Sequence, residues 1–218
     1  MEVSFIITIS VILLIILLSV IFRKLIKLKL LQIKYGKYSY KYVSKFKKFT
    51  NKSPFPYCFK DDIMPYLRLM ENKRENADIY FSEKNVLFED TPLSIKANDL
   101  LKTRGEPDCF NIFKIKELEL LAYGYRIEKF GTSTKAVFFF LKDEYVMGEY
   151  IIDDVSNVDI NSVAEKILQN TGVSTENKST LFYVDCKNKT SVFFYENGFS
   201  ILIRYVNATI GQLNEIME

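Results

Sequence analysis

The sequence predicts an α+β fold in which an N-terminal transmembrane helix precedes a soluble domain of duplicated helix plus antiparallel β-meander units. Three observations support this prediction: a charge-free apolar run near the N-terminus, two later helical segments with clear start and stop signals, and several strand-like runs after each of them. We expect a transmembrane anchor at 1–22, a basic juxtamembrane helix at 23–50, a linker or arm at 51–76, and a soluble domain at 77–218 whose related halves span about 77–156 and 157–218.

The apolar run extends from Phe5 to Phe22 without a charged residue. As a helix it would be roughly 27 Å long, close to the hydrocarbon thickness of a bilayer, whereas buried core helices seldom carry so long an apolar stretch. A cleaved signal peptide is disfavoured because only Glu2 precedes the run and Arg23 and Lys24 follow it, with no small-residue cleavage site. We therefore expect a retained signal-anchor.

The charge after the run predicts an orientation. Residues 23–60 hold twelve basic side chains and no acidic one. Because Lys and Arg collect on the cytoplasmic flank of a span, we expect a single-pass protein of the cell membrane with its N-terminus outside and its C-terminal domain in the cytoplasm. The alternative is an exported domain. Residues 61–218 carry 18 basic and 26 acidic side chains, and this acidity disfavours a nucleic-acid partner.

Basic and aromatic residues alternate at helical spacing within residues 22–49. The pattern predicts a helix whose lysines contact anionic lipid headgroups while its tyrosines lie at the membrane interface, so that the lipid bilayer is one expected partner. The alternative is a solvated charged linker. The residues assigned to this interface are Lys34, Lys37, Lys41, Lys45, Tyr35, Tyr38 and Tyr42.

The breaker segment Asn51–Tyr57 marks the first boundary, and a short helix is expected within 61–76. In the soluble domain, Thr91 as N-cap, Pro92 at the first helical position and Gly105 as C-cap predict one helix. A capping box at Ser162 and Glu165 predicts a second over 160–170. Strands are expected at 78–82, 85–88, 109–115, 118–127, 135–141, 145–152, 180–186, 190–195 and 199–206, with a last helix at 209–217.

The two halves contain similar hairpins. An apolar aromatic run beginning at Val137 and another beginning at Val192 each precede a polar turn and a further strand. We interpret this as a duplicated unit. One helix per copy would place the helices on one face of the sheet and leave the other for a partner or for water.

The segment from Thr91 to Pro107, a capped helix that ends in Gly105-Glu-Pro107 and leads into strands, resembles the small outer-membrane assembly lipoproteins of the BamE or SmpA/OmlA type and the β-lactamase-inhibitor-protein repeats. The resemblance covers about residues 90–150, with a weaker second copy to 206. It implies a non-enzymatic protein-binding module of the cell envelope. The chain departs from that family in having no lipidated Cys. Its bias toward Lys, Asn, Ile, Phe and Tyr is typical of an AT-rich bacterial genome.

The sequence offers little catalytic chemistry. It has no histidine, which removes the usual general base and His-ligated metals, and it has no Gly-rich nucleotide loop. Cys58, Cys109 and Cys186 lack metal-site spacing, and their odd number fits a reducing compartment; a Cys109–Cys186 disulfide is conceivable if the domain is exported. Turn and cap chemistry accounts for the acidic pairs at 143–144 and 153–154. We predict no enzyme, no cofactor, no metal and no catalytic residue.

Two aromatic runs are the remaining feature. Since alternate side chains of a strand face opposite ways, a run of three rings is either buried on both faces or leaves one ring exposed. The first alternative is core packing. The second is a surface for an unknown protein partner or for self-association, formed by Phe138, Phe140, Phe193 and Tyr195.

Together these features predict a membrane-tethered, non-catalytic protein-interaction module. The alternative is an exported assembly or structural factor of the cell envelope, as the resemblance implies.

Overall fold

The computed structural model describes the backbone of residues 2–59, 63–115, 117–174 and 179–207, and the side chains of these ranges from Val11 on, except residues 65 and 71. The chain divides into two compact units, one up to Pro54 and one from Phe55 on. The predicted helix at 209–217 lies outside the described residues.

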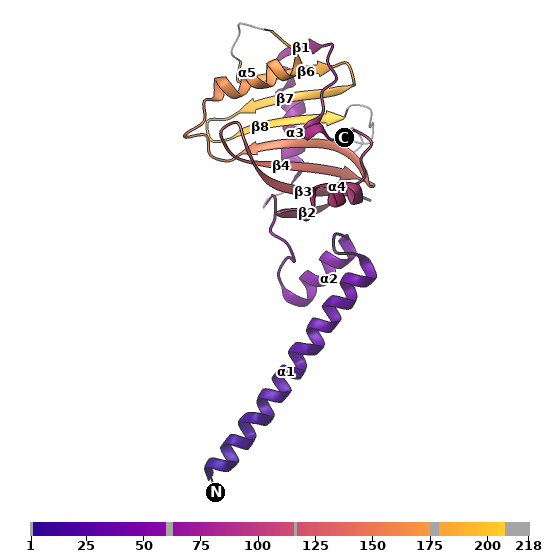
Figure 1. Ribbon diagram of the computed structural model, residues 1–218, viewed down its shortest axis with the longest axis vertical. Helices are drawn as coiled ribbons and strands as arrows, with labels where there is room; N and C mark the ends of the chain where they lie inside the picture. Colours follow the sequence, from indigo (N-terminus) through magenta and orange to yellow (C-terminus); the bar gives the residue numbers. More distant parts are fainter. Residues whose placement is uncertain (1, 60–62, 116, 175–178, 208–218) are drawn as a thin grey trace. The chain divides into compact units, whose positions relative to one another are not determined.

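The first unit consists of helices α1 (Glu2–Tyr35) and α2 (Tyr40–Thr50) (Figure 1). The prediction of one continuous helix over 23–50 is wrong. Gly36 has φ 81°, a conformation that glycine adopts without strain, and its N–H donates to the carbonyl of Gln32 as α1 ends. Ser39 then caps α2, since its hydroxyl accepts a hydrogen bond from the N–H of Tyr42 at 3.1 Å.

The predicted transmembrane anchor, and with it the single-pass cell-membrane topology and the orientation of the chain, is overturned. Among the helices whose residues are described, none combines the length and the apolarity that crossing a bilayer requires.

The second unit is organised around one sheet of eight strands in the order β1-β6-β7-β8-β5-β4-β3-β2 (Figure 1). Neighbouring strands are antiparallel except for β1 and β6, which are parallel. The strands are β1 (Asp78–Ser82), β2 (Cys109–Ile115), β3 (Leu118–Lys129), β4 (Thr132–Leu141), β5 (Glu144–Ile152), β6 (Leu181–Cys186), β7 (Thr190–Glu196) and β8 (Ile201–Asn207).

This single mixed sheet also corrects the predicted fold class, which expected two meander units. The meanders β2–β5 and β6–β8 do exist, but they are not separate bodies. Their last strands, β5 and β8, pair along their lengths from Met147 opposite Val206 to Ile152 opposite Ile201, so the two meanders share one sheet. The parallel strand β1 extends it beyond β6.

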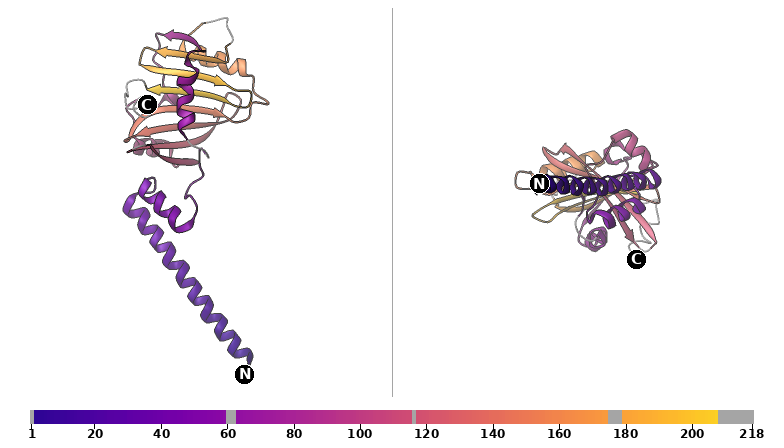
Figure 2. Two further views of the ribbon diagram at one scale, coloured as in Figure 1. Left: turned by 180° about the vertical axis from the view of Figure 1, so that it is seen from behind. Right: turned by 90° about the horizontal axis from the view of Figure 1, so that it is seen from below.

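Helices cover both faces of the sheet, whereas one open face was predicted. Helix α3 (Ile63–Arg74) crosses the strands on one face, and α5 (Ile160–Thr171) lies on the other (Figures 1 and 2). Ile63 and Leu67 of α3 are buried in the core of their face. The segment that sequence patterns assign to a linker or arm therefore supplies the helix that covers one face of the sheet.

The chain between β1 and β2 differs most from the expected elements. Residues 85–88 form no strand, and the helix expected from Thr91 is confined to α4 (Ala97–Arg104). The cause is Phe88 in the short 3₁₀ helix η1 (Phe88–Asp90), whose buried ring lies against Gly148 of β5. A Cβ added at Gly148 would come within 2.1 Å of that ring, so the close approach requires glycine. The packing of Phe88 against Gly148 thus determines the local structure here, in place of the helix that the cap at Thr91 predicts.

A buried ion pair lies where the two meanders meet. Glu149 of β5 and Arg204 of β8 face each other in the ladder, and Nε of Arg204 donates to Oε1 of Glu149 at 2.8 Å. Both side chains are almost completely excluded from solvent. The hydroxyl of Tyr66 donates to Oε2 of Glu149 at 2.5 Å, and Arg204 donates to the backbone carbonyls of Tyr66 and Leu67. The pair thus joins β5, β8 and α3.

Burial raises the pKa of the Glu149 carboxyl, and the adjacent guanidinium opposes that effect. We predict that Arg204→Met lowers the free energy of unfolding by about 3–5 kcal/mol, because a carboxylate is left buried without its charged partner. Lys135→Met provides the control. Its ion pair with Asp153 is more exposed and should contribute at most about 1 kcal/mol. Urea unfolding measures both variants, and equal losses would show that the buried pair has no special role.

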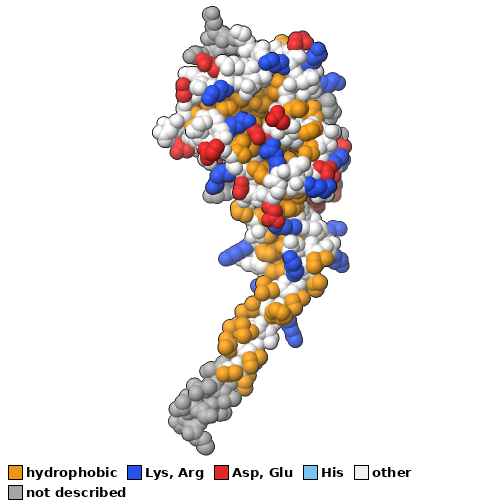
Figure 3. Space-filling model, in the orientation of Figure 1, with side chains coloured by type: hydrophobic (Ala, Val, Ile, Leu, Met, Phe, Trp, Pro, Cys, Tyr) orange, Lys and Arg blue, Asp and Glu red, His pale blue; other side chains and the backbone are white. Residues whose placement is uncertain are grey.

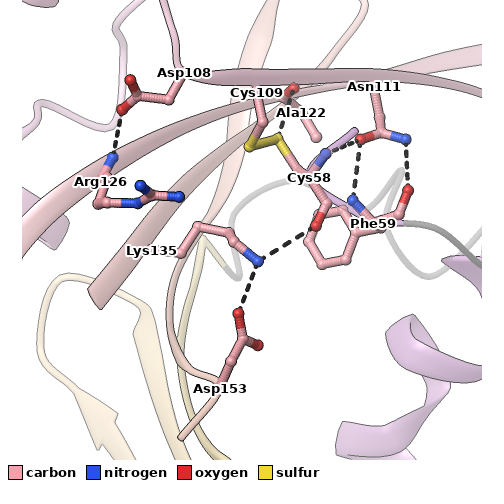
Figure 4. Close-up of a disulfide and its surroundings, with 9 residues drawn as sticks. All are labelled: Cys58, Phe59, Asp108, Cys109, Asn111, Ala122, Arg126, Lys135 and Asp153. Carbon is pink, nitrogen blue, oxygen red and sulfur yellow. Dashed lines mark hydrogen bonds and ion pairs between the residues drawn. A yellow bond between two sulfur atoms is a disulfide. The ribbon is translucent and has the colours of Figure 1, made fainter. Parts of the chain in front are cut away.

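A disulfide fixes the start of the second unit to the edge strand β2. It joins Cys58 to Cys109, while Cys186 is a buried free thiol, so the conceivable Cys109–Cys186 pairing is wrong. The amide of Asn111 binds the same segment, as its oxygen accepts from the N–H groups of Cys58 and Phe59 and its nitrogen donates to the carbonyl of Phe59 (Figure 4). Sequence spacing could not reveal this pairing, because Cys58 lies outside the predicted domain.

The disulfide closes a loop across a sequence separation of 51 residues. Replacing both cysteines by alanine should therefore destabilise the second unit by about 4 kcal/mol, the chain-entropy value for a loop of that length. Chemical denaturation of the oxidised protein and the double variant tests this. Reduction of the wild type should reproduce the loss, and Cys186→Ala should leave the effect of reduction unchanged.

Candidate functional site: an uncovered sheet edge

Strand β1 forms one end of the sheet, and within the described ranges no strand pairs with its outer edge (Figure 1). The carbonyl of Ser82 accepts a hydrogen bond from the N–H of Lys187 next to β6. Backbone groups of a strand alternate in direction. The N–H and C=O groups therefore point toward β6 at Asp78, Tyr80 and Ser82, and they point outward at Ile79 and Phe81.

The side chains of this edge are also exposed. Ile79 is 46% and Phe81 79% accessible, values unlike those of the apolar residues in the central strands. Both project to the α3 face, since Ile79 is in register with Tyr183 and Phe81 with Asp185. The strand contains neither Lys nor Pro, the residues that commonly protect an edge from further pairing. Backbone and side chains together present an edge able to accept another strand.

The opposite edge is treated differently. The segment before α3 runs along β2, where the N–H of Phe110 donates to the carbonyl of Pro56 at 2.9 Å. Asn111 and the disulfide hold that segment in place, and the ring of Phe59 packs against Phe113 and Phe139. One edge of the sheet is thus covered by the chain itself, and the contrast distinguishes β1.

A second candidate is a polar pocket of about 380 Å³ between η1, β3, β5 and α5. The carboxylate of Glu89 receives hydrogen bonds from Lys129 and from the hydroxyl of Tyr150, and it lies 3.6 Å from Arg104. Glu89 and Asp90 both have φ near 50°, which is uncommon for residues other than glycine. These contacts hold the η1 turn in that conformation.

The protonation chemistry of this pocket does not suit acid–base catalysis. Burial alone would raise the pKa of Glu89, but hydrogen bonds from Lys129 and Tyr150 and the charges of Lys129 and Arg104 outweigh it, so the pKa is lowered. Burial and the hydrogen bond to Glu89 raise the pKa of Tyr150. Both shifts move the groups away from neutral pH, where a general acid or base must exchange its proton. We assign Glu89 a structural role.

The lowered pKa of Glu89 predicts an acid-sensitive contribution to stability. With a folded-state pKa below the ordinary value of 4.5, ionised Glu89 stabilises the fold above about pH 4.5, and this contribution is lost as pH falls through the folded-state value. Glu89→Gln should therefore show a smaller decrease in free energy of unfolding between pH 5 and pH 3 than the wild type. Glu128→Gln, at an exposed position, is the control and should follow the wild-type curve.

The predicted interface residues of the first unit are distributed over the end of α1, the turn at 36–39 and α2. Lys45 donates to the hydroxyl of Tyr35 at 3.1 Å and lies over its ring, and Lys37 lies near the ring of Tyr38. Tyr42 is buried, so it is not part of an exposed aromatic stripe. Lys34 and Lys41 are exposed. Apolar side chains of α1 between Val11 and Ile33 are exposed as well (Figure 3). Contact with anionic headgroups stays a prediction.

The aromatic runs pack on both faces of the sheet. Phe138, Phe140 and Phe193 are fully buried, as the core-packing alternative expected, and they cannot offer a surface to a partner. Tyr195 at the end of β7 is half-buried. The acidic pairs have structural partners, since Asp143 accepts the N–H of Ala97 at the start of α4 and Asp153 pairs with Lys135. The pair at 61–62 lies outside the described residues.

Sequence reasoning found strand 78–82 but not its importance. Its apolar residues Ile79 and Phe81 alternate with polar neighbours, the signal of a strand with one buried face. Only the sheet order shows that this strand lies at the end and that its apolar positions are exposed.

Over the ranges described, no three His, Cys, Asp or Glu side chains gather into a group that could hold a metal ion. Comparisons with protein-family models, with curated proteins and with solved structures find no match for this chain.

Proposed function

We propose that the second unit is a non-catalytic protein-interaction module that binds an extended polypeptide segment along the outer edge of β1. The observation that carries this proposal is the pair of outward backbone positions, Ile79 and Phe81, with exposed apolar side chains on a strand that contains neither Lys nor Pro. In such recognition, main-chain hydrogen bonds supply affinity and alternate side chains supply specificity.

Two further features support this proposal over an enzyme. The polar pocket beside η1 holds a carboxyl and a tyrosine whose pKa values are shifted away from neutrality. The opposite edge of the sheet is covered by a disulfide-bonded segment, so strand addition there would require that segment to leave. The β1 edge needs no such rearrangement among the described residues.

A display library of random ten-residue peptides tests the proposal. Selection on the full chain should enrich sequences that alternate apolar and polar residues, and binding should be lost in Ile79→Pro. This substitution removes an outward N–H and none of the hydrogen bonds to β6, so the fold should persist, as proline is tolerated on the solvent side of edge strands. Ile79→Ala is the matched control, because it keeps the N–H and should retain most of the binding.

The opposite result is equally clear. Peptides that bind Ile79→Pro as well as the wild type, or a selection with no enrichment, would refute strand capture at β1. Circular dichroism of Ile79→Pro confirms that the sheet is intact. Tyr80→Pro, which removes an N–H directed at β6, should instead destabilise the domain.

One observation favours a second candidate, an exported assembly or structural factor of the cell envelope. A disulfide persists in oxidising compartments and is rare where thiols are kept reduced. Alkylation of freshly lysed cells followed by mass spectrometry tests this candidate. Cys58 and Cys109 should be found linked, and recovery of both as alkylated thiols would oppose it. Cys186, whose thiol pKa burial raises to about 11, should be alkylated only after denaturation.

A further inference from the structure

The β1 edge is complementary to itself. In an antiparallel pairing centred on Tyr80, Ile79 of one copy lies opposite Phe81 of the other, Asp78 lies opposite Ser82, and Tyr80 lies opposite Tyr80. In this register no like charges are directly opposed. A symmetric pair of identical surfaces of this kind is the usual basis of a two-fold dimer.

The direction of the backbone groups selects this register. Two residues directly opposite each other in an antiparallel ladder exchange two hydrogen bonds only where both point their N–H and C=O groups toward the partner strand. Ile79 and Phe81 are the outward positions of β1, and centring on Tyr80 places each opposite the other. Neighbouring registers, centred on Ile79 or Phe81, would use only one of the two positions within the strand.

The exposed side chains fit the same arrangement. A two-fold axis perpendicular to the sheet keeps both α3 faces on one side, so Ile79 and Phe81 of both copies form one continuous apolar group. Phe81, which is 79% accessible in one chain, gains a facing apolar partner from the second. Pairing therefore satisfies main-chain groups and covers apolar surface at once.

We infer that the partner strand of β1 is β1 of a second copy of this chain, which gives a two-fold dimer with a continuous sheet across the interface. This inference rests on the proposed strand-capture function and names its partner. A five-residue edge buries less surface than the roughly 1,200–2,000 Å² of stable interfaces, so the dimer is weak and dissociates on dilution.

A cysteine placed on the two-fold axis provides the test. Tyr80 and its symmetry mate form the non-hydrogen-bonded pair, with Cα atoms about 4.5 Å apart, a separation that permits a disulfide. In the full chain carrying Cys186→Ala, Tyr80→Cys should form an intermolecular disulfide on mild oxidation, seen as a dimer on a non-reducing gel. Association through the exposed residues of α1 would not bring two copies of residue 80 into contact.

Two controls sharpen the result. Tyr57→Cys in the same background places a cysteine at an exposed position outside β1 and should form at least tenfold less disulfide-linked dimer. Adding Ile79→Pro to Tyr80→Cys should reduce cross-linking to the Tyr57→Cys level. Since Tyr80 packs edge-on against Phe182, circular dichroism checks that Tyr80→Cys is folded.

A measurement without cysteine substitution complements the cross-link. In light scattering over a concentration series, the average mass of the wild type should increase with protein concentration, and Ile79→Pro should remove this increase. Equal cross-linking of Tyr80→Cys and Tyr57→Cys, with equal masses for wild type and Ile79→Pro, would overturn the dimer. If displayed peptides still bound the wild type and not Ile79→Pro, the strand-capture function would be retained with a partner other than a second copy. If peptide binding were absent as well, both the dimer and the strand-capture function would be refuted.

Discussion

The buried pair of Glu149 and Arg204 is the constraint on which the architecture of the second unit depends. The residues face each other across β5 and β8, where the two meanders meet, so the pair can form only if both meanders share one sheet in this register. The charges also need further partners in the dry interior. Tyr66 and the backbone carbonyls of α3 provide them, and this requirement places α3 over the junction.

Once α3 covers one face, the aromatic runs have a simple explanation. Arg204 and Tyr205 point to opposite faces, and the same alternation buries Phe193 beneath α3 and Phe138 beside Phe88. Unbroken apolar runs occur in strands that are covered on both sides. The aromatic runs therefore belong to the interior, and the binding surface that we propose lies at the edge of the sheet.

The sequence was a good guide to local structure and a poor one to long-range arrangement. Most strands and the helix at 160–171 follow from periodicity, which acts over a few residues, although Asp159 and not Ser162 caps the start of that helix. The pairing of β5 with β8 depends on residues 55 positions apart, and the Cys58–Cys109 link joins segments assigned to different domains. At Phe88, contact with Gly148 overrides the helix signal at Thr91. The exposed edge could not be foreseen, because exposure of Ile79 and Phe81 follows from strand order alone.

Strand order also explains why the two edges differ in character. The disulfide, Asn111 and the chain leading to α3 are built onto β2, whereas β1 joins the sheet by a parallel pairing and presents its outer residues without such a cover among the described residues. An edge with apolar side chains and outward backbone groups favours pairing wherever a compatible strand is available. A strand whose best complement is its own sequence meets that condition whenever two copies meet. The proposed self-association thus rests on the same asymmetry that places the covering segment on the other edge.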